Sequence, residues 1–386
     1  MSALAAFTDL LVATKAASLS DPDKLVSQAT QYRTTLFRRM MKGLSQKAMV
    51  QNGTKIVDHV QLKTVNRRRH YNPTDTFGYT GSNSLTQIEV PWRFSLVDMV
   101  TQEHELDLNQ GDRVNVFKRV LAAKNAEMEQ SFWEGNEDDL WAAPNFDTME
   151  SSTLGEGVTG APLSLRCFIT ADGAVPSASN GGIASGSSAW TSIMGVSPTT
   201  YPNWKNQYET FDNTSATTRS ADVGGVLDAM HRMWLDVQWE SPDTTQKYFE
   251  DTRLNKMVIV CNKESMVELK RLATMMNNVL TPRHDIGWAA GGVVFNGLPI
   301  TYLAKLDSID TGGTAGNGTY ASGALTYQWR WINFNHIKPI FHSGHYRKRQ
   351  EKDGGAAQPF SKVVIEDTWQ NLWCANRREQ GIVRAA

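Results

Sequence analysis

We predict an α+β fold for this chain of 386 residues from three features of its sequence. Apolar residues recur at helical spacing over 22–46 and 112–135. Apolar and polar residues alternate, as in half-buried strands, over 54–65 and 85–106. Residues 220–345 mix short apolar runs with further helical segments. The length is enough for one elaborated domain or for two to three smaller ones.

The composition indicates a globular protein with no membrane partner. No apolar stretch approaches the roughly 18 residues of a membrane-spanning helix, and no basic segment precedes the first apolar run, so we expect a protein used without secretion. Cys167, Cys261 and Cys374 are far apart and form no C-x-x-C pair, so we expect neither a disulfide framework nor a zinc site. Twelve tryptophans favour contacts between surfaces.

The formal net charge of -1 hides two blocks of opposite sign. Residues 1–72 contain 12 Lys or Arg against 4 Asp or Glu, a net charge of +8. Residues 73–160 contain 5 Lys or Arg against 16 Asp or Glu, a net charge of -11. Such blocks can complement each other within one subunit or between copies of it. A protein that binds nucleic acid as its main task is more often basic throughout.

The N-terminal third predicts an arm and a long hairpin. The helical segments 3–14 and 22–46 are too short to build a core alone. The strands 54–65 and 85–106 flank a segment rich in turn-forming residues and predict a long β-hairpin with polar faces. Because an isolated hairpin is marginally stable in water, we expect this one to lie against another chain.

One long helix follows the hairpin. Asn109 or Asp112 can cap a helix over 112–135, and Gly135 is expected to end it. An acidic run comes directly after it. Residues 148–200 are rich in Gly, Ser, Ala and Thr, so we expect irregular surface excursions there, with one short strand at 163–170.

The remaining chain predicts an α/β region and a final strand. We expect helices at 220–239 and 263–278, a buried strand at 256–261, and a hairpin over 292–303 whose turn is Asn296-Gly297. Further strands are expected at 326–334, near 337–341 and at 361–376.

The sequence contains no recognisable catalytic or metal-binding motif. The loop 312–318 is glycine-rich but lacks the context of a phosphate loop. His336, His342 and His345 have no carboxylate in metal-binding register, and the acidic run after the long helix is typical of a solvated surface. We therefore expect no enzyme, no cofactor and no metal site.

The order of these parts resembles the major capsid proteins of tailed bacteriophages, which share the Hong Kong 97-type fold. Matched piece by piece, the chain resembles five parts of that fold: an N-terminal arm at 1–52, an extended E-loop hairpin at 53–108, a P domain with a long spine helix and the Gly/Ser-rich excursion at 109–219, an A domain at 220–345, and a return strand completing the P domain at 346–386.

The resemblance implies a structural subunit that assembles with itself into pentamers and hexamers of an icosahedral head. That head encloses double-stranded DNA, held by non-specific contact, and is a virion component assembled in the cytoplasm of the bacterial host. The implied partners are a separate scaffolding protein, a portal protein and a decoration protein. Lys63 is the only lysine near the middle of the hairpin, so covalent cross-linking is not predicted.

Three alternatives remain open at this point. An encapsulin-like compartment has the same fold but loads a cargo enzyme. An enzyme could hold an unrecognised active site in 220–345. A nucleic-acid binder could use the three consecutive arginines before the hairpin tip, although only one aromatic residue lies close to them.

The three arginines are instead expected to contact an adjacent subunit, because guanidinium groups suit bidentate pairing with carboxylates. Their expected partners are the acids on and after the long helix. The residues of this predicted contact are Arg67, Arg68, Arg69 and the nearby Tyr71 on one side, and Glu127, Glu134, Glu137, Asp138 and Asp139 on the other.

Overall fold

A computed structural model of the chain forms two compact units, and each is described by itself. The first unit contains residues 95–137 and 344–368. The second contains 35–94, 138–343 and 369–386. The elements α4, β4 and β13 contribute residues to both. The structure describes residues 36–42, 49–50, 53–62, 68, 70, 72, 85–102, 114–150, 160–177, 180, 183, 188–221, 223–237, 257–277, 286–289, 292–310, 327–353 and 361–386.

The first unit combines strands with the long helix α4 (Val114–Trp141). Strand β13 (Ser361–Cys374) pairs with β4 (Arg93–Gln102), and it pairs antiparallel with β12 (Lys348–Asp353). Directly opposite residues share a face of a sheet, so the pairs Arg349–Glu366 and Glu351–Val364 lie on one face. The pairs of Gln350 with Ile365 and of Lys352 with Val363 lie on the other face.

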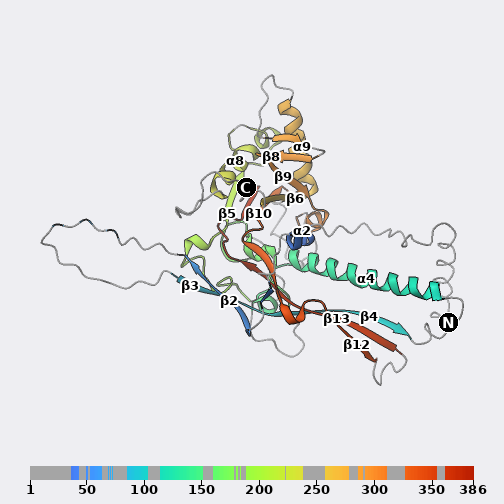
Figure 1. Cartoon of the computed structure of the whole chain (residues 1–386). Helices are drawn as coiled ribbons and strands as arrows, with labels where there is room; N and C mark the ends of the chain where they lie inside the picture. Colours follow the sequence, from blue (N-terminus) through green and yellow to red (C-terminus); the bar gives the residue numbers. More distant parts are fainter. Residues whose placement is uncertain are drawn as a thin grey trace. The chain divides into compact units, whose positions relative to one another are not determined.

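Helix α4 runs further than the sequence predicted, and Figure 1 shows it as one continuous helix. Gly135 does not end it, and a Cβ there would meet nothing within 4 Å. The helix continues because its last turn carries Leu140 and Trp141, which are buried at 3% and 2% exposure. The acidic run therefore lies within the helix, so our expectation of an acidic turn after it was wrong.

The second unit begins with helix α2 (Leu36–Lys42) and strand β1 (Met49–Val50), which pairs in parallel with β11 (Ile337–His342). The rest of the predicted arm lies outside the described residues. Strands β2 (Lys55–Gln61) and β3 (Leu85–Pro91) form the predicted antiparallel ribbon. Its tip also lies mostly outside the described residues.

The predicted single strand 85–106 is divided into β3 and β4 at Trp92. Pro91 has no backbone N–H to continue a ladder. Trp92 is buried and donates from Nε1 to the Gly53 carbonyl at 3.0 Å, and Arg93 donates from Nε to the Met149 carbonyl at 3.2 Å. These contacts fix the chain at the base of the ribbon.

A seven-stranded sheet forms the core of the second unit, in the order β5-β14-β10-β6-β9-β8-β7. Helices α8 (Val226–Val237) and α9 (Lys263–Asn277) pack in one apolar cluster with the sheet. The turn Asn296-Gly297 has φ of 44° and 81°, as the predicted two-residue hairpin requires. The strands are β5 (Gln207–Phe211), β6 (Met257–Cys261), β7 (Ile286–Ala289), β8 (Gly292–Phe295), β9 (Leu298–Tyr302), β10 (Gln328–Asn333) and β14 (Gly381–Ala385).

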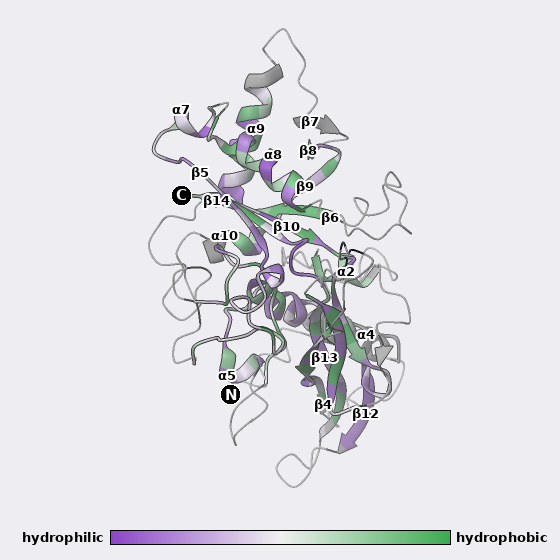
Figure 2. Ribbon diagram, turned by 90° about the vertical axis from the view of Figure 1, so that its left-hand side faces the viewer, coloured by the Kyte–Doolittle hydropathy of each residue, from purple (hydrophilic) through white to green (hydrophobic). Residues whose placement is uncertain are grey.

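Both faces of this sheet are buried at its centre. Every residue of β6 and β10 is buried, and in Figure 2 β6 is green along its length while α9 alternates green and purple. Arg330 on β10 lies 5.7 Å from the ring centroid of Trp141. Strand β14 was not predicted, although it lies inside the sheet between β5 and β10.

The prediction of irregular surface excursions at 148–200 was wrong for the segment 163–171, which is buried. Residues 165–168 form the short helix α6 (Leu165–Phe168) instead of a strand. Leu163, Cys167 and Ile169 have at most 1% exposure. Other short helices are α5 (Phe146–Met149), η2 (Pro202–Trp204), α7 (Ala216–Arg219), α10 (Ala304–Asp310) and η4 (Ser343–His345).

Candidate assembly surfaces

The acidic residues of α4 differ in their surroundings. Glu127 is exposed, and Glu134 accepts a hydrogen bond from Gln130 one turn earlier. Glu137 is only 2% exposed. A buried carboxylate is not accessible to an arginine of another chain, so Glu127 and Glu134 are better placed for such a contact than Glu137.

The last two acids of the run lie in the second unit. Asp138 is exposed and forms an ion pair with Lys305 on α10, with Oδ1 and Nζ 2.5 Å apart. Burial, with a smaller effect from the neighbouring Asp138, raises the pKa of Asp139 to about 6. Asp138 is therefore already paired within its own chain, and Asp139 is the harder of the two acids to ionise.

The arginine side of the predicted contact is only partly described. Arg67, Arg69 and Tyr71 lie outside the described residues. Arg68 is described and is exposed. The described residues therefore do not test the contact between the arginines and the α4 acids, which stays a prediction.

An ion cluster on the first unit was not found from the sequence. Glu366 on β13 is 2% exposed and accepts hydrogen bonds from Nε of Arg347 and, at 3.1 Å, from Nε of Arg349. The Arg347 guanidinium also lies 5.0 Å from the ring centroid of Phe132 on α4. The local sequence alternates charges, but only the register of β12 against β13 shows which charges meet.

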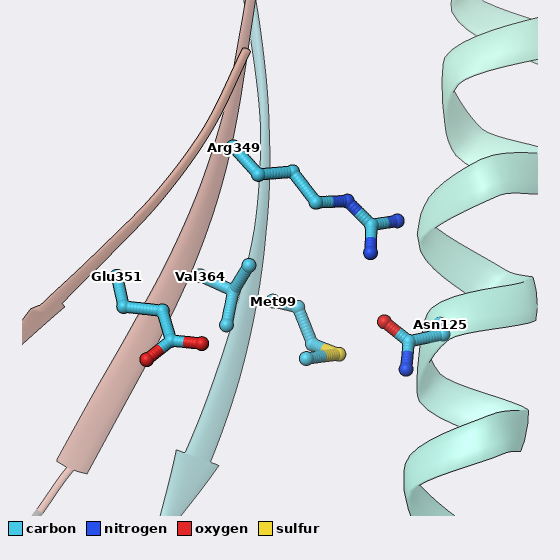
Figure 3. Close-up of a pocket in the computed structure, with 5 residues that line it drawn as sticks. All are labelled: Met99, Asn125, Arg349, Glu351 and Val364. Carbon is cyan, nitrogen blue, oxygen red and sulfur yellow. The ribbon is translucent and has the colours of Figure 1, made fainter. Parts of the chain in front are cut away.

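A cavity of about 530 Å³ opens beside this cluster, between α4 and the sheet of the first unit. Figure 3 shows Arg349 reaching toward the helix and Met99 lying between the strands and Asn125. Glu351 and Val364 also line it. Among the described lining residues, Arg349 and Glu351 give the cavity one charge of each sign, beside the apolar Met99 and Val364.

The opposite face of the same sheet exposes apolar side chains. Met99 faces the cavity, so Leu96 and Val100 lie on the other face of β4, because side chains alternate along a strand. Leu96 is 58% exposed and Val100 is 40% exposed. On β13, Val363 and Ile365 share this face. We call Leu96, Val100, Val363 and Ile365 the apolar stripe.

The histidines and cysteines considered in the sequence analysis lie in packed surroundings. His342 packs against Trp92, and Nδ1 of His345 lies 2.8 Å from Oδ2 of Asp367. Within the described ranges no group of His, Cys, Asp or Glu could hold a metal ion. The three cysteines are buried and form no disulfide, and burial raises the pKa of Cys167 to about 11. No helix in the described part of the chain is long and apolar enough to cross a membrane.

Comparison with known proteins identifies the fold. No family model and no curated protein sequence matches the chain. The chain is similar to a solved chain of the cyanophage A-1(L) capsid, with a TM-score of 0.50 and 11% identity over 93% of this chain and 96% of that one. It is also similar to a chain from the capsid of an empty GTA particle, with a TM-score of 0.48 and 13% sequence identity. That match covers 97% of this chain and 98% of the other. A solved chain of Mycobacterium phage Bobi matches with a TM-score of 0.46 and 10% sequence identity, over 94% of each chain.

At this level of identity the likeness shows the fold, and the fold is that of phage capsid proteins. The mixed α+β class is confirmed. The resemblance to the major capsid proteins of tailed phages, drawn from the order of the predicted elements, is confirmed at the level of the fold.

Proposed function

We propose that the chain is a structural major capsid protein that assembles with itself into pentamers and hexamers of an icosahedral phage head enclosing double-stranded DNA. The likeness to the cyanophage capsid chain over 93% of this chain carries the proposal. A shared fold does not by itself establish a shared function. The apolar stripe supports the proposal independently: Leu96 and Val100 are exposed beside the half-buried Val363 and Ile365, with Asp98 between the first two. Exposed apolar side chains of this kind are typical of a surface that another chain covers.

Several partners belong to this proposal. A separate scaffolding protein, a portal protein and a decoration protein are expected, with the protein located in the virion after assembly in the host cytoplasm. The ribbon β2–β3 is proposed to be the E-loop, α4 the spine helix, and the seven-stranded sheet with α8 and α9 the A domain. The domain boundaries stated from the sequence remain part of this proposal.

The assembly itself can be tested with the purified protein and its scaffolding protein. We expect rings and closed shells by negative-stain microscopy. A preparation that stays monomeric with the scaffolding protein present would contradict the proposal. The contents of the shells separate the two closest functions, since packaged DNA supports a phage head and a packaged enzyme supports an encapsulin-like compartment.

The contact between the hairpin arginines and α4 can be tested by charge reversal. Changing Arg67, Arg68 and Arg69 together to Glu should leave the folding of the monomer unchanged and prevent stable shells, because like charges would face each other across the contact. Particle yield by sedimentation and monomer unfolding by circular dichroism measure the two effects.

A control variant reverses three exposed basic residues elsewhere, on α8 and α9: Arg232→Glu, Lys263→Glu and Lys270→Glu. If only the hairpin variant loses its shells, the position of the charges matters. Equal losses in both variants would mean that net charge alone is responsible, and normal shells from the hairpin variant would refute the contact.

A further inference from the structure

A strained turn lies at the base of the β2–β3 ribbon. Ile193 and Val196 are paired through two backbone hydrogen bonds of 2.9 and 3.1 Å. The two residues between them, Met194 and Gly195, have φ of 55° and 79°. Glycine adopts this left-handed conformation readily, whereas methionine does so at a cost. A strained residue of this kind persists only where its surroundings hold it.

Two residues form hydrogen bonds with the turn. The carbonyl of Met194 accepts a hydrogen bond from the backbone N–H of Glu89 on β3, at 3.2 Å. The backbone N–H of Gly195 donates to Oε1 of Glu150, at 3.1 Å. The backbone N–H of Met194 also lowers the pKa of the same carboxyl group. The turn therefore connects a single carboxyl group to a strand of the ribbon.

Glu150 titrates near neutral pH in this position. Burial raises its pKa to about 7, while the N–H groups of Gly195 and Met194 and the charges of Arg377 and Arg93 act in the opposite direction. The buried thiol of Cys167 is a further neighbour. On the other side of the turn the Glu89 carboxylate is paired with Lys55, with Oε1 and Nζ 2.9 Å apart.

The direction of the effect follows from linkage. The two N–H groups of the turn lower the pKa of Glu150, so they bind the ionised form more tightly than the protonated form. The other oxygen, Oε2, is buried and has no hydrogen-bond partner among the described residues. Protonation therefore weakens the attachment of the turn and provides no replacement for it.

We propose that the ionised Glu150 carboxylate is a latch that fixes the Ile193–Val196 turn against Glu89 of β3, and that protonation of this one group releases the turn and the base of the ribbon. This inference deepens the proposed function, because the ribbon is the part proposed to reach a neighbouring subunit. Its test uses the unassembled chain, so the latch can fail while the shell proposal stands.

Amide hydrogen exchange followed by mass spectrometry tests the latch between pH 6 and pH 8, with rates corrected for the intrinsic effect of pH. Peptides covering 85–92 and 188–197 should be about tenfold more protected at pH 8 than at pH 6, since a hydrogen bond to a charged group contributes about 1.4 kcal/mol or more. The midpoint should lie near pH 7. A profile without this step would overturn the proposal.

Three variants assign the step to its residue. Glu150→Gln keeps the size of the side chain without its charge, so both peptides should show the low protection of pH 6 at every pH. Glu209→Gln on β5 should keep the step, because Glu209 also has a raised pKa but does not bond to the turn. His59→Gln should keep it as well, because the exposed His59 on β2 does not bond to the turn.

A step that persists in Glu150→Gln, or that disappears in His59→Gln, would contradict the assignment to Glu150. If Glu150→Gln does not fold, the exchange profiles of the wild type, Glu209→Gln and His59→Gln still test the proposal. The latch requires a step near pH 7 in all three of these proteins.

Discussion

Arg377 joins its own part of the chain to two other segments of the second unit through one buried guanidinium group. It donates to the carbonyls of Phe168 and Trp204 at 3.0 and 2.9 Å, and to Oδ1 of Asn206 at 3.1 Å. Burial lowers its pKa to about 10, which still leaves it charged at neutral pH. The Gly/Ser-rich segment is thus ordered at this point by polar contacts from a distant part of the chain.

Changing Arg377 to Met should destabilise the protein by about 3–5 kcal/mol, because the buried acceptors lose their donors. Arg378→Met is a matched control, since Arg378 is the next residue and is partly exposed. The control should lose no more than about 1 kcal/mol. Chemical denaturation at pH 7 measures both, and equal effects would show that Arg377 has no special role.

Glu150 should also make stability depend on pH. Its pKa is raised from 4.5 to about 7 in the folded protein. Its contribution to stability is therefore fully present below pH 4.5 and is lost as the pH rises through 7. Relative to Glu150→Gln, the wild-type protein should lose about 3 kcal/mol across this range. Denaturation of both proteins at pH 4.5, 6 and 8 measures the difference.

This global effect has the opposite sign to the effect on the turn. Burial penalises the charged form of Glu150 overall, whereas the N–H groups of the turn favour it. Relative to Glu150→Gln, the wild-type protein should therefore have a lower free energy of unfolding at pH 8 than at pH 4.5. Its turn should nevertheless be held more firmly at pH 8. A difference in stability that does not change with pH would show that Glu150 does not titrate in this window.

The same contrast shows what sequence can establish about single residues. The charges of Glu127, Glu137 and Asp139 were evident from the sequence, and an acidic surface was the natural interpretation. Burial of Glu137 could not be predicted, because it depends on α4 continuing past Gly135. Glu150 carried no signal at all, since its strained partner turn lies more than forty residues away in the sequence.

At the scale of elements, β14 packs closely against α8 at Gly381. A Cβ on Gly381 would lie 2.3 Å from Sδ of Met233 and 3.1 Å from Cγ2 of Val237. We expect Gly381→Ala to cost about 1–3 kcal/mol through overpacking. Thermal denaturation measures this cost. The double variant with Met233→Ala should behave differently from the sum of the two single changes, because the residues share one contact.

Gly135→Ala is the control for this substitution. A Cβ at Gly135 would meet nothing within 4 Å, and the residue lies inside α4. Alanine there should stabilise the protein by up to about 1 kcal/mol, because it favours the helix more than glycine does. A destabilising Gly135→Ala would mean that the helix does not continue through this position.

The apolar stripe predicts a change in assembly without a change in folding. Leu96→Glu should alter the unfolding free energy of the monomer by no more than about 0.5 kcal/mol, since the side chain is exposed. Shell yield should fall, because a charge would be buried under the covering chain. Leu235→Glu on α8, which is 71% exposed, is the control and should assemble normally. Normal shells from Leu96→Glu would exclude the stripe as an assembly surface.

Local patterns predicted elements well where the apolar residues form one clear face or one continuous run. Helix α8, strand β6 and the Asn296-Gly297 turn were located by periodicity and turn chemistry alone. The division of the long strand at Trp92 was missed, although Pro91 was visible. The reason is that the division depends on contacts of Trp92 and Arg93 with residues 53 and 149.

At the scale of the whole molecule, the order of elements was enough to predict a capsid fold. The order of strands in the seven-stranded sheet was not accessible, because it is decided by pairing between residues far apart in the chain. Strand β5, for example, pairs in parallel with β14, so Gln207 lies opposite Gly381. The proposed domain boundaries and the assembly contacts remain predictions for the experiments above.

The position of β14 has a consequence for biosynthesis. Ribosomes make residues 381–385 long after β5, yet among the described strands β5 pairs only with β14. A nascent chain that stops before β14 lacks the strand that lies between β5 and β10, so the seven-stranded sheet stays incomplete. Synthesis of this strand therefore determines when the sheet can be finished, and a chain that stops before residue 381 cannot complete the same core.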